Sequence, residues 1–110
     1  MPIILANLGG VFPFIIERLE GYWDRVHAGE PPLAVRPIEA LRRYYLETAS
    51  GHPAAIRMTA EVMGIDRLVF GSDYPSFDFV RALRSVRECG LPSDQIALIL
   101  GGNAKRLVRL

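Results

Sequence analysis

Short apolar or aromatic runs alternate with segments of helical periodicity along this chain. Leu68, Val69 and Phe70 form an uninterrupted apolar run, which is typical of a parallel strand covered on both faces. Strands are predicted over residues 3–6, 44–48 and 68–70. Helices are predicted over residues 13–26, 37–43, 54–63, 78–88 and 93–110, the last one interrupted at 101–103. This order predicts an α/β fold with parallel strands joined by right-handed helical crossovers.

Capping residues and prolines set the limits of several elements. Gly64 is placed to cap the end of helix 54–63, and Ser93-Asp94 is placed to cap the start of the last helix. Pro13 suits the first turn of the first helix. The stretch from Gly29 to Pro37 contains three prolines and is predicted to be a loop.

The first helix carries three aromatic side chains, Phe14, Tyr22 and Trp23, whose role has to be assigned. Phe14, Ile15, Leu19 and Tyr22 recur on it at helical spacing, which predicts one apolar face. We expect Tyr22, Trp23 and the phenylalanines to pack in the core rather than to form a platform for a cofactor.

Length and composition limit the classes of protein to consider. The chain has 110 residues, whereas a full eight-stranded α/β barrel needs roughly 250, so we expect one domain over residues 1–110. Lys and Arg number 13 against 12 for Asp and Glu, so a nucleic-acid partner is not expected. A single cysteine, Cys89, predicts a buried free thiol in a cytoplasmic protein. The apolar residues 1–6 are too few for a signal peptide or a membrane span, and no membrane partner is expected.

Asp73 is the first candidate for chemistry. It follows the predicted strand 68–70 after the break at Gly71, and the carboxyl ends of parallel strands are where α/β folds place their functional groups. Ser72-Asp73 ahead of a helix is equally typical of an N-terminal cap. The spacing alone leaves both interpretations open.

Four motifs together resemble the C-terminal portion of the amidohydrolase-related metal-dependent hydrolases. This group includes aminocarboxymuconate semialdehyde decarboxylase and γ-resorcylate-type decarboxylases. The motifs, in the family's order and spacing, are Asn7-Leu8-Gly9-Gly10 with Pro13-Phe14, Glu47-Thr48-Ala49-Ser50, Gly64-Ile65-Asp66-Arg67 running into Gly71-Ser72-Asp73-Tyr74-Pro75, and Gly102-Asn103-Ala104-Lys105-Arg106-Leu107. The resemblance implies the last three or so βα units of a TIM-barrel-like fold.

The resemblance also implies a site and a reaction class. Members hold a divalent metal, usually zinc, at the strand ends, where it serves hydrolysis or non-oxidative decarboxylation of a small carboxylated or amide-like substrate. By resemblance, Asp73 is the counterpart of a metal ligand and proton-transfer group.

Two departures from the family pattern count against a complete metal site. The family has a histidine ligand where this chain has Asn7, and an amide oxygen is a weaker zinc ligand than an imidazole. The family's His-x-His pair has no counterpart, since the histidines are His27 and His52. His27 is expected on the surface. His52, after the second strand, is either a catalytic acid or base or a solvent-facing loop residue.

Three strands form an incomplete barrel, which leads to three hypotheses. Such a sheet leaves two open edges and an apolar face, so we expect a homo-oligomer or pairing with a complementary chain. In the first hypothesis, the chain is part of a metal-dependent hydrolase or decarboxylase, and the chain is inactive when isolated. Alternatively, it is a non-catalytic remnant that serves as an oligomeric or interaction domain, without a metal. Thirdly, it is a piece of a longer gene product.

Overall fold

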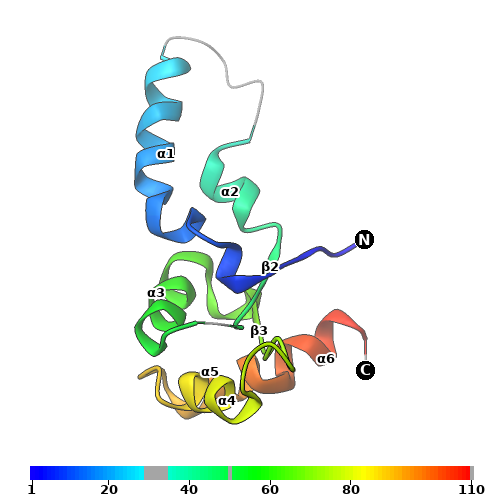
Figure 1. The fold of residues 1–110 in the computed structure, drawn as a ribbon. Helices are drawn as coiled ribbons and strands as arrows, with labels where there is room; N and C mark the ends of the chain where they lie inside the picture. The colour runs from blue at the N-terminus through cyan, green and yellow to red at the C-terminus, as the bar shows by residue number, and fades with distance from the viewer. Residues whose placement is uncertain (29–34, 50, 110) are drawn as a thin grey trace.

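The computed structural model describes residues 1–28, 35–49 and 51–109. Residues 29–34 of the predicted proline loop, Ser50 of the predicted turn and Leu110 lie outside the described residues. The described chain forms a three-stranded sheet with helices around it (Figure 1). Helices α1 and α2 stand together at one end of the molecule, and α4 and α5 lie at the other.

The sheet is parallel, as predicted, and its strands follow one another in chain order. Its strands are β1 (Ile4–Leu5), β2 (Tyr45–Glu47) and β3 (Leu68–Val69). Leu46, at the centre of β2, is in register with Leu5 on one side and with Leu68 on the other. Each strand is shorter than its predicted range, because the chain turns away soon after the paired residues. The predicted order of elements is therefore confirmed.

Helices follow each strand. They are α1 (Phe12–Val26), α2 (Pro37–Leu41), α3 (Pro53–Met63), α4 (Phe79–Arg87), α5 (Ser93–Ala97) and α6 (Asn103–Leu107). Shorter turns complete the chain: η1 (Asn7–Gly9), η2 (Ile65–Arg67) and the π-helical segment η3 (Leu98–Gly102). The predicted interruption of the last helix falls at η3, where Gly101 leaves helical backbone angles.

The hydrophobic core lies between β2, β3 and the helices that follow them. Its innermost side chains have no exposed surface: Leu46, Ile56, Leu68, Val86, Cys89 and Ile99. Cys89 is a free buried thiol, as predicted. Burying an aliphatic side chain of this size stabilises the fold by roughly 1.5–3 kcal/mol. The fully buried hydrophobic side chains therefore lie in the part of the chain after residue 45.

The prediction that the aromatic residues pack in the core is wrong for most of them. Phe14 is 75% exposed and Tyr22 is 64% exposed. The buried face of α1 carries Pro13 and Ile16 instead, because α1 packs with this face toward α2 and α3. Trp23 is half-buried and stacks on His27 with ring centroids 3.9 Å apart, so His27 is not fully on the surface as predicted.

An ion-pair cluster ties α2 to α1. Arg36 donates to Glu20 at 2.7 Å and contacts Asp24 at 2.9 Å, and these hydrogen bonds raise the pKa of Arg36. The other carboxylate oxygen of Glu20 accepts the backbone N–H of Ile38 at 2.8 Å, in the first turn of α2. Glu20 thus caps α2 from a neighbouring helix.

The caps of the remaining helices agree only in part with the predictions. Gly64 closes α3 with φ 94° and donates its N–H to the carbonyl of Ala60, as predicted. Ser93 and Asp94 do not cap the last helix: the N-cap of α5 is Pro92, which has no side-chain donor or acceptor. Among the described residues, no helix is long and apolar enough to cross a membrane.

Candidate active site at the carboxyl ends of the strands

The three parallel strands end at one edge of the sheet, and each is followed by a polar turn. Asn7 follows β1, Thr48 follows β2, and Gly71 lies two residues beyond β3. Because the strands are parallel and in register, these turns lie beside one another. This edge brings together the motifs that are far apart in the sequence.

The Glu47 carboxylate links the turns after β1 and β2. One of its oxygens accepts the backbone N–H of Asn7 at 3.2 Å, and the other accepts the N–H of Ala49. Hydrogen bonds to a charged acceptor are about twice as strong as bonds between neutral groups. The two turns are therefore held through one carboxylate.

Gly71 brings the turn after β3 to the same carboxylate. A Cβ atom at residue 71 would overlap the Glu47 side chain, so only glycine permits this approach. The N–H of Gly71 also donates to the Thr48 hydroxyl at 3.3 Å. All three turns consequently meet around Glu47 and Thr48.

Asp73 lies beyond Gly71 and is exposed. Its backbone is left-handed, with φ 55°, a conformation that aspartate tolerates better than most residues. Within residues 1–28, 35–49 and 51–109, its carboxylate takes part in no hydrogen bond or ion pair. The carboxylate is therefore available to a ligand from outside these residues.

The capping interpretation of Asp73 is wrong. The N-cap of α4 is Asp78, whose Oδ1 accepts the N–H of Val80 at 2.8 Å. Ser72 accepts the N–H of Tyr74 at 3.3 Å in a local turn. Asp73 contributes only its backbone carbonyl, which accepts the N–H of Phe77 at 3.1 Å.

Asn7, which the family resemblance matches to a histidine ligand, is exposed. Its φ of 52° and that of Leu8, 55°, make the turn after β1 left-handed. Asparagine accommodates this backbone, whereas a buried leucine does so at a cost of about 1–2 kcal/mol. The surrounding contacts must hold this turn in place.

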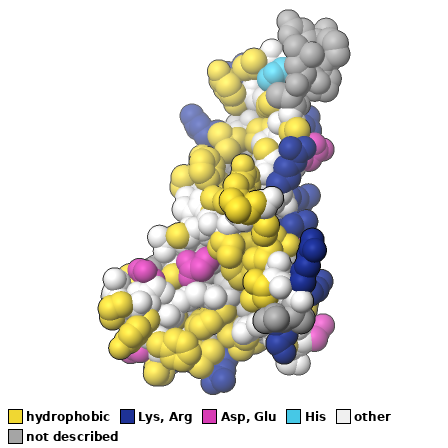
Figure 2. All heavy atoms as spheres, turned by 90° about the vertical axis from the view of Figure 1, so that its right-hand side faces the viewer, with side chains coloured by type: hydrophobic (Ala, Val, Ile, Leu, Met, Phe, Trp, Pro, Cys, Tyr) yellow, Lys and Arg dark blue, Asp and Glu magenta, His cyan; other side chains and the backbone are white. Residues whose placement is uncertain are grey.

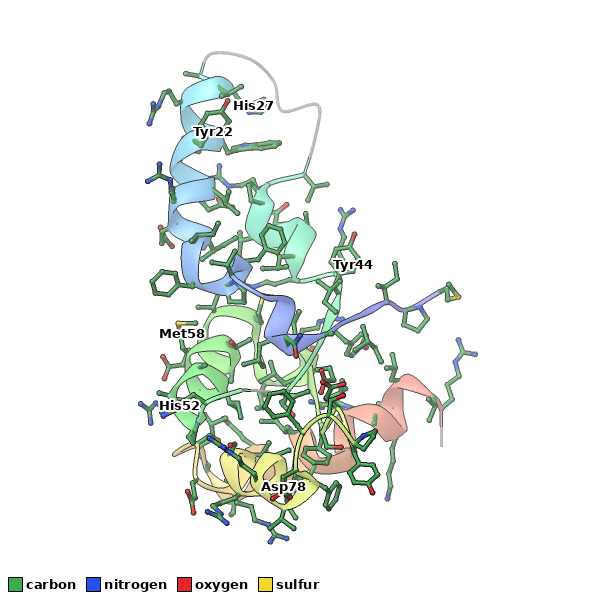
Figure 3. All side chains as sticks on the ribbon, in the orientation of Figure 1. Tyr22, His27, Tyr44, His52, Met58 and Asp78 are labelled. Carbon is green, nitrogen blue, oxygen red and sulfur yellow. The ribbon has the colours of Figure 1, made fainter. Side chains whose placement is uncertain are left out.

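His52 starts α3 and is exposed (Figure 3). Its Nδ1 accepts the N–H of Ala54 at 3.1 Å, so the ring acts as the N-cap of α3. With Nδ1 as acceptor, the neutral ring carries its proton on Nε2. His52 lines an open hollow of about 330 Å³ together with Asp78 and Arg81, and Asp73 is not among the lining residues. The structure thus does not bring the two predicted catalytic residues into one pocket.

The described residues do not by themselves form a metal site. No group of three or more His, Cys, Asp or Glu side chains within them is placed to hold an ion. Glu47 already bonds two backbone amides, which leaves Asp73 as the free carboxylate at the strand ends. One carboxylate and the amide of Asn7 do not suffice for zinc, which takes at least three protein ligands.

Sequence reasoning gave Glu47 no role, although the residue lies in one of the family motifs. The signal available was a charged side chain at the end of a short strand, beside Thr48 and opposite Gly71. That pattern is common at solvent-facing strand ends, so it did not indicate a link between three turns.

Comparison with known proteins places the whole chain in one family. A family model described as amidohydrolase matches residues 2–110. The 5-carboxyvanillate decarboxylase of Sphingomonas paucimobilis is 31% identical over 99% of this chain, with a TM-score of 0.83. The chain covers 34% of that protein.

Two further solved structures share the fold. One is a dihydroxybenzoic acid decarboxylase from Polaromonas sp. JS666, solved with manganese and the inhibitor 2-nitroresorcinol, with 21% identity and a TM-score of 0.85. The chain covers 34% of it and is itself covered to 99%. The other is a 2,6-dihydroxybenzoate decarboxylase in complex with 2,6-dihydroxybenzoate, with the same identity and TM-score and 99% and 35% coverage. The chain spans about a third of the length of these structures.

Proposed function

Since the chain belongs to the amidohydrolase family, we propose that it supplies the C-terminal βα units of a metal-dependent decarboxylase or hydrolase site. The observation that carries this proposal is the free Asp73 carboxylate at the carboxyl edge of the sheet. Residues 1–110 would form a single partial barrel domain that is inactive alone, because the remaining ligands and loops of a barrel site are not among the described residues.

In this proposal Asp73 holds a divalent metal together with ligands from outside the described residues. A bound divalent metal polarises carboxylate oxygens and lowers the pKa of bound water. The Polaromonas decarboxylase was solved with manganese, so a divalent metal suits this fold. The prediction of zinc rests on the family resemblance alone.

The substrate we propose is a small carboxylated aromatic compound. Support comes from the 31% identity to a 5-carboxyvanillate decarboxylase across the chain. An amide-like substrate is the alternative that the family name leaves open. Asp73 is exposed, so a substrate whose carboxylate is bound to the metal can reach it from outside the sheet edge.

For His52 we propose a catalytic role in the assembled site, in which the exposed ring donates a hydrogen bond from Nε2 to the reacting group of the substrate. The neutral ring has its hydrogen on Nε2 because Nδ1 accepts the N–H of Ala54. The variant His52→Asn tests this role, since asparagine keeps an acceptor for the cap but removes the imidazole. The activity of the assembled protein should fall about a hundredfold, while thermal stability changes little. Unchanged activity would remove His52 from the proposal.

The partner we propose is a second copy or a complementary chain, and the location we propose is the cytoplasm. Support for association comes from the uncovered side of β1, where Ile3 and Ile4 are about half-exposed.

Metal analysis of the purified protein tests the main proposal. After saturation with Mn²⁺ and gel filtration, the chain associated with a second copy or with its complementary chain should retain metal. The same assembly with Asp73→Ala should lose it. Asp94→Ala, which removes an exposed carboxylate on α5, is the matched control and should retain the metal. If the associated protein retains no metal, the alternative of a non-catalytic interaction domain is favoured instead.

A further inference from the structure

We infer that Glu47 is a positioning residue whose carboxylate sets the relative placement of Asn7 and Asp73. The inference rests on the proposed function only in treating Asp73 as a functional residue of the site. Its evidence is the set of contacts that the Glu47 side chain makes with three turns distant in sequence.

The first step of the argument concerns the turn after β1. Asn7 and Leu8 adopt left-handed backbone angles, which a leucine does not adopt without strain. The Asn7 N–H, at the start of this turn, donates to Glu47 Oε2 across 40 residues of sequence. A charged acceptor at this point stabilises the strained turn and thereby fixes where the Asn7 side chain leaves the backbone.

The second step concerns the turn after β3. Gly71 passes so close to the Glu47 carboxylate that no side chain fits between them. Gly71 is also joined to Thr48 through its N–H, at 3.3 Å. Asp73 follows two residues later, so its position depends on how closely this turn approaches β2.

The third step excludes a simpler role. A carboxylate kept only for solubility would extend into water, whereas Glu47 is half-buried and both of its oxygens accept backbone N–H groups. Both amides belong to turns at the strand ends, not to the strand ladder. The contacts therefore bear on the loops that carry the candidate site more than on the sheet.

Amide hydrogen exchange on the full chain tests the inference. In the wild type, the amides of Asn7 and Ala49 should be protected relative to free peptides. Glu47→Ala should accelerate exchange at these two amides about tenfold or more. The Thr48 amide, bonded to the Val69 carbonyl in the ladder at 3.1 Å, should change less than about twofold. A purely structural role would accelerate all three amides alike, and that result would overturn the inference.

Further variants distinguish the effect of losing the Glu47 carboxylate from a general destabilisation of the fold. Glu47→Gln keeps the shape and one acceptor and should restore part of the protection. Gly71→Ala should displace the carboxylate and reproduce the pattern of Glu47→Ala, and in the double variant the two effects should not add. Glu61→Ala, an exposed glutamate on α3, is the matched control and should leave both amides unchanged.

The placement of Asp73 has its own readout. The amide resonance of Asp73 should move in Glu47→Ala and return toward its wild-type position in Glu47→Gln. An unmoved Asp73 resonance, or unprotected Asn7 and Ala49 amides in the wild type, would overturn the inference. No metal enters these measurements, so loss of the metal-binding proposal would leave their outcome intact.

Discussion

The two edge strands of the sheet, β1 and β3, have similarly apolar sequences but differ in burial: the β3 side is covered, whereas the β1 side is partly exposed. On the β3 side, Leu68 has no exposed surface, and the N–H of Phe70 donates to the carbonyl of Ile99 at 2.9 Å. On the β1 side, Ile3 and Ile4 are 47% and 48% exposed. Hydrophobic side chains are spread over much of the face seen in Figure 2. The difference teaches that an apolar strand is buried only where the rest of the chain supplies a cover.

A groove continues the uncovered region between α1 and α2. Its volume is about 410 Å³, and apolar side chains line it, among them Phe12, Ile16 and Leu41. On the β3 side, by contrast, η3 and α6 contact the strand. The β1 side therefore has the apolar composition of a protein core, but the described residues cover only part of it.

Truncating one side chain on each side should give the largest contrast. Leu68→Ala, inside the core, should lower the free energy of unfolding by about 2–5 kcal/mol. Phe14→Ala, on the exposed face of α1, should change it by less than about 0.5 kcal/mol. Urea denaturation at one protein concentration measures both. Equal losses would show that the two sides are packed alike.

Asn103 offers the second test, because it covers the β3 side with polar contacts. Its Nδ2 donates to the carbonyls of Ile65 and Leu68, both at 2.7 Å, and its Oδ1 accepts from Arg106. Asn103→Ala leaves buried carbonyls without donors and should cost about 1–3 kcal/mol. The same urea experiment measures this loss, with Glu61→Ala on the exposed face of α3 as the control. A cost for Asn103→Ala no larger than the control's would contradict this account of the β3 side.

Association should depend on the β1 side alone. Ile4→Lys places a charge on the uncovered strand and should weaken self-association or pairing about tenfold. Lys105→Glu on α6 is an exposed control at the other side of the sheet. Sedimentation velocity over a range of concentrations detects the change. A wild-type protein that stays monomeric at all concentrations would refute the prediction of an oligomer.

The smallest effect is expected at the ion pairs between α1 and α2. Glu20→Gln removes the charge that Arg36 contacts and weakens the cap on α2, so thermal stability should fall slightly. Because Arg36 is exposed to solvent, 1 M NaCl should reduce the difference between variant and wild type. A difference that is the same in low and high salt would show that the cap, not the charge, matters here.

Much of the fold was predictable because it depends on local sequence. The run at residues 68–70, the glycine after helix 54–63 and the alternation of strands and helices determine the parallel order that the structure shows. The family was predictable from four short motifs, and the family model matches residues 2–110. The position of Asp73 after β3 follows from the same pattern.

What the sequence did not reveal depends on contacts between distant turns and on packing. Phe14 and Tyr22 look like core residues by their spacing, but which face of α1 is buried depends on where α2 and α3 lie. Asp78, not Asp73, caps α4, since the chain takes a further turn before the helix begins. The sequence by itself determined the order of strands and the family. Only the tertiary structure decided which apolar side chains are covered and that Glu47 joins three strand ends, because both depend on residues brought together by the fold.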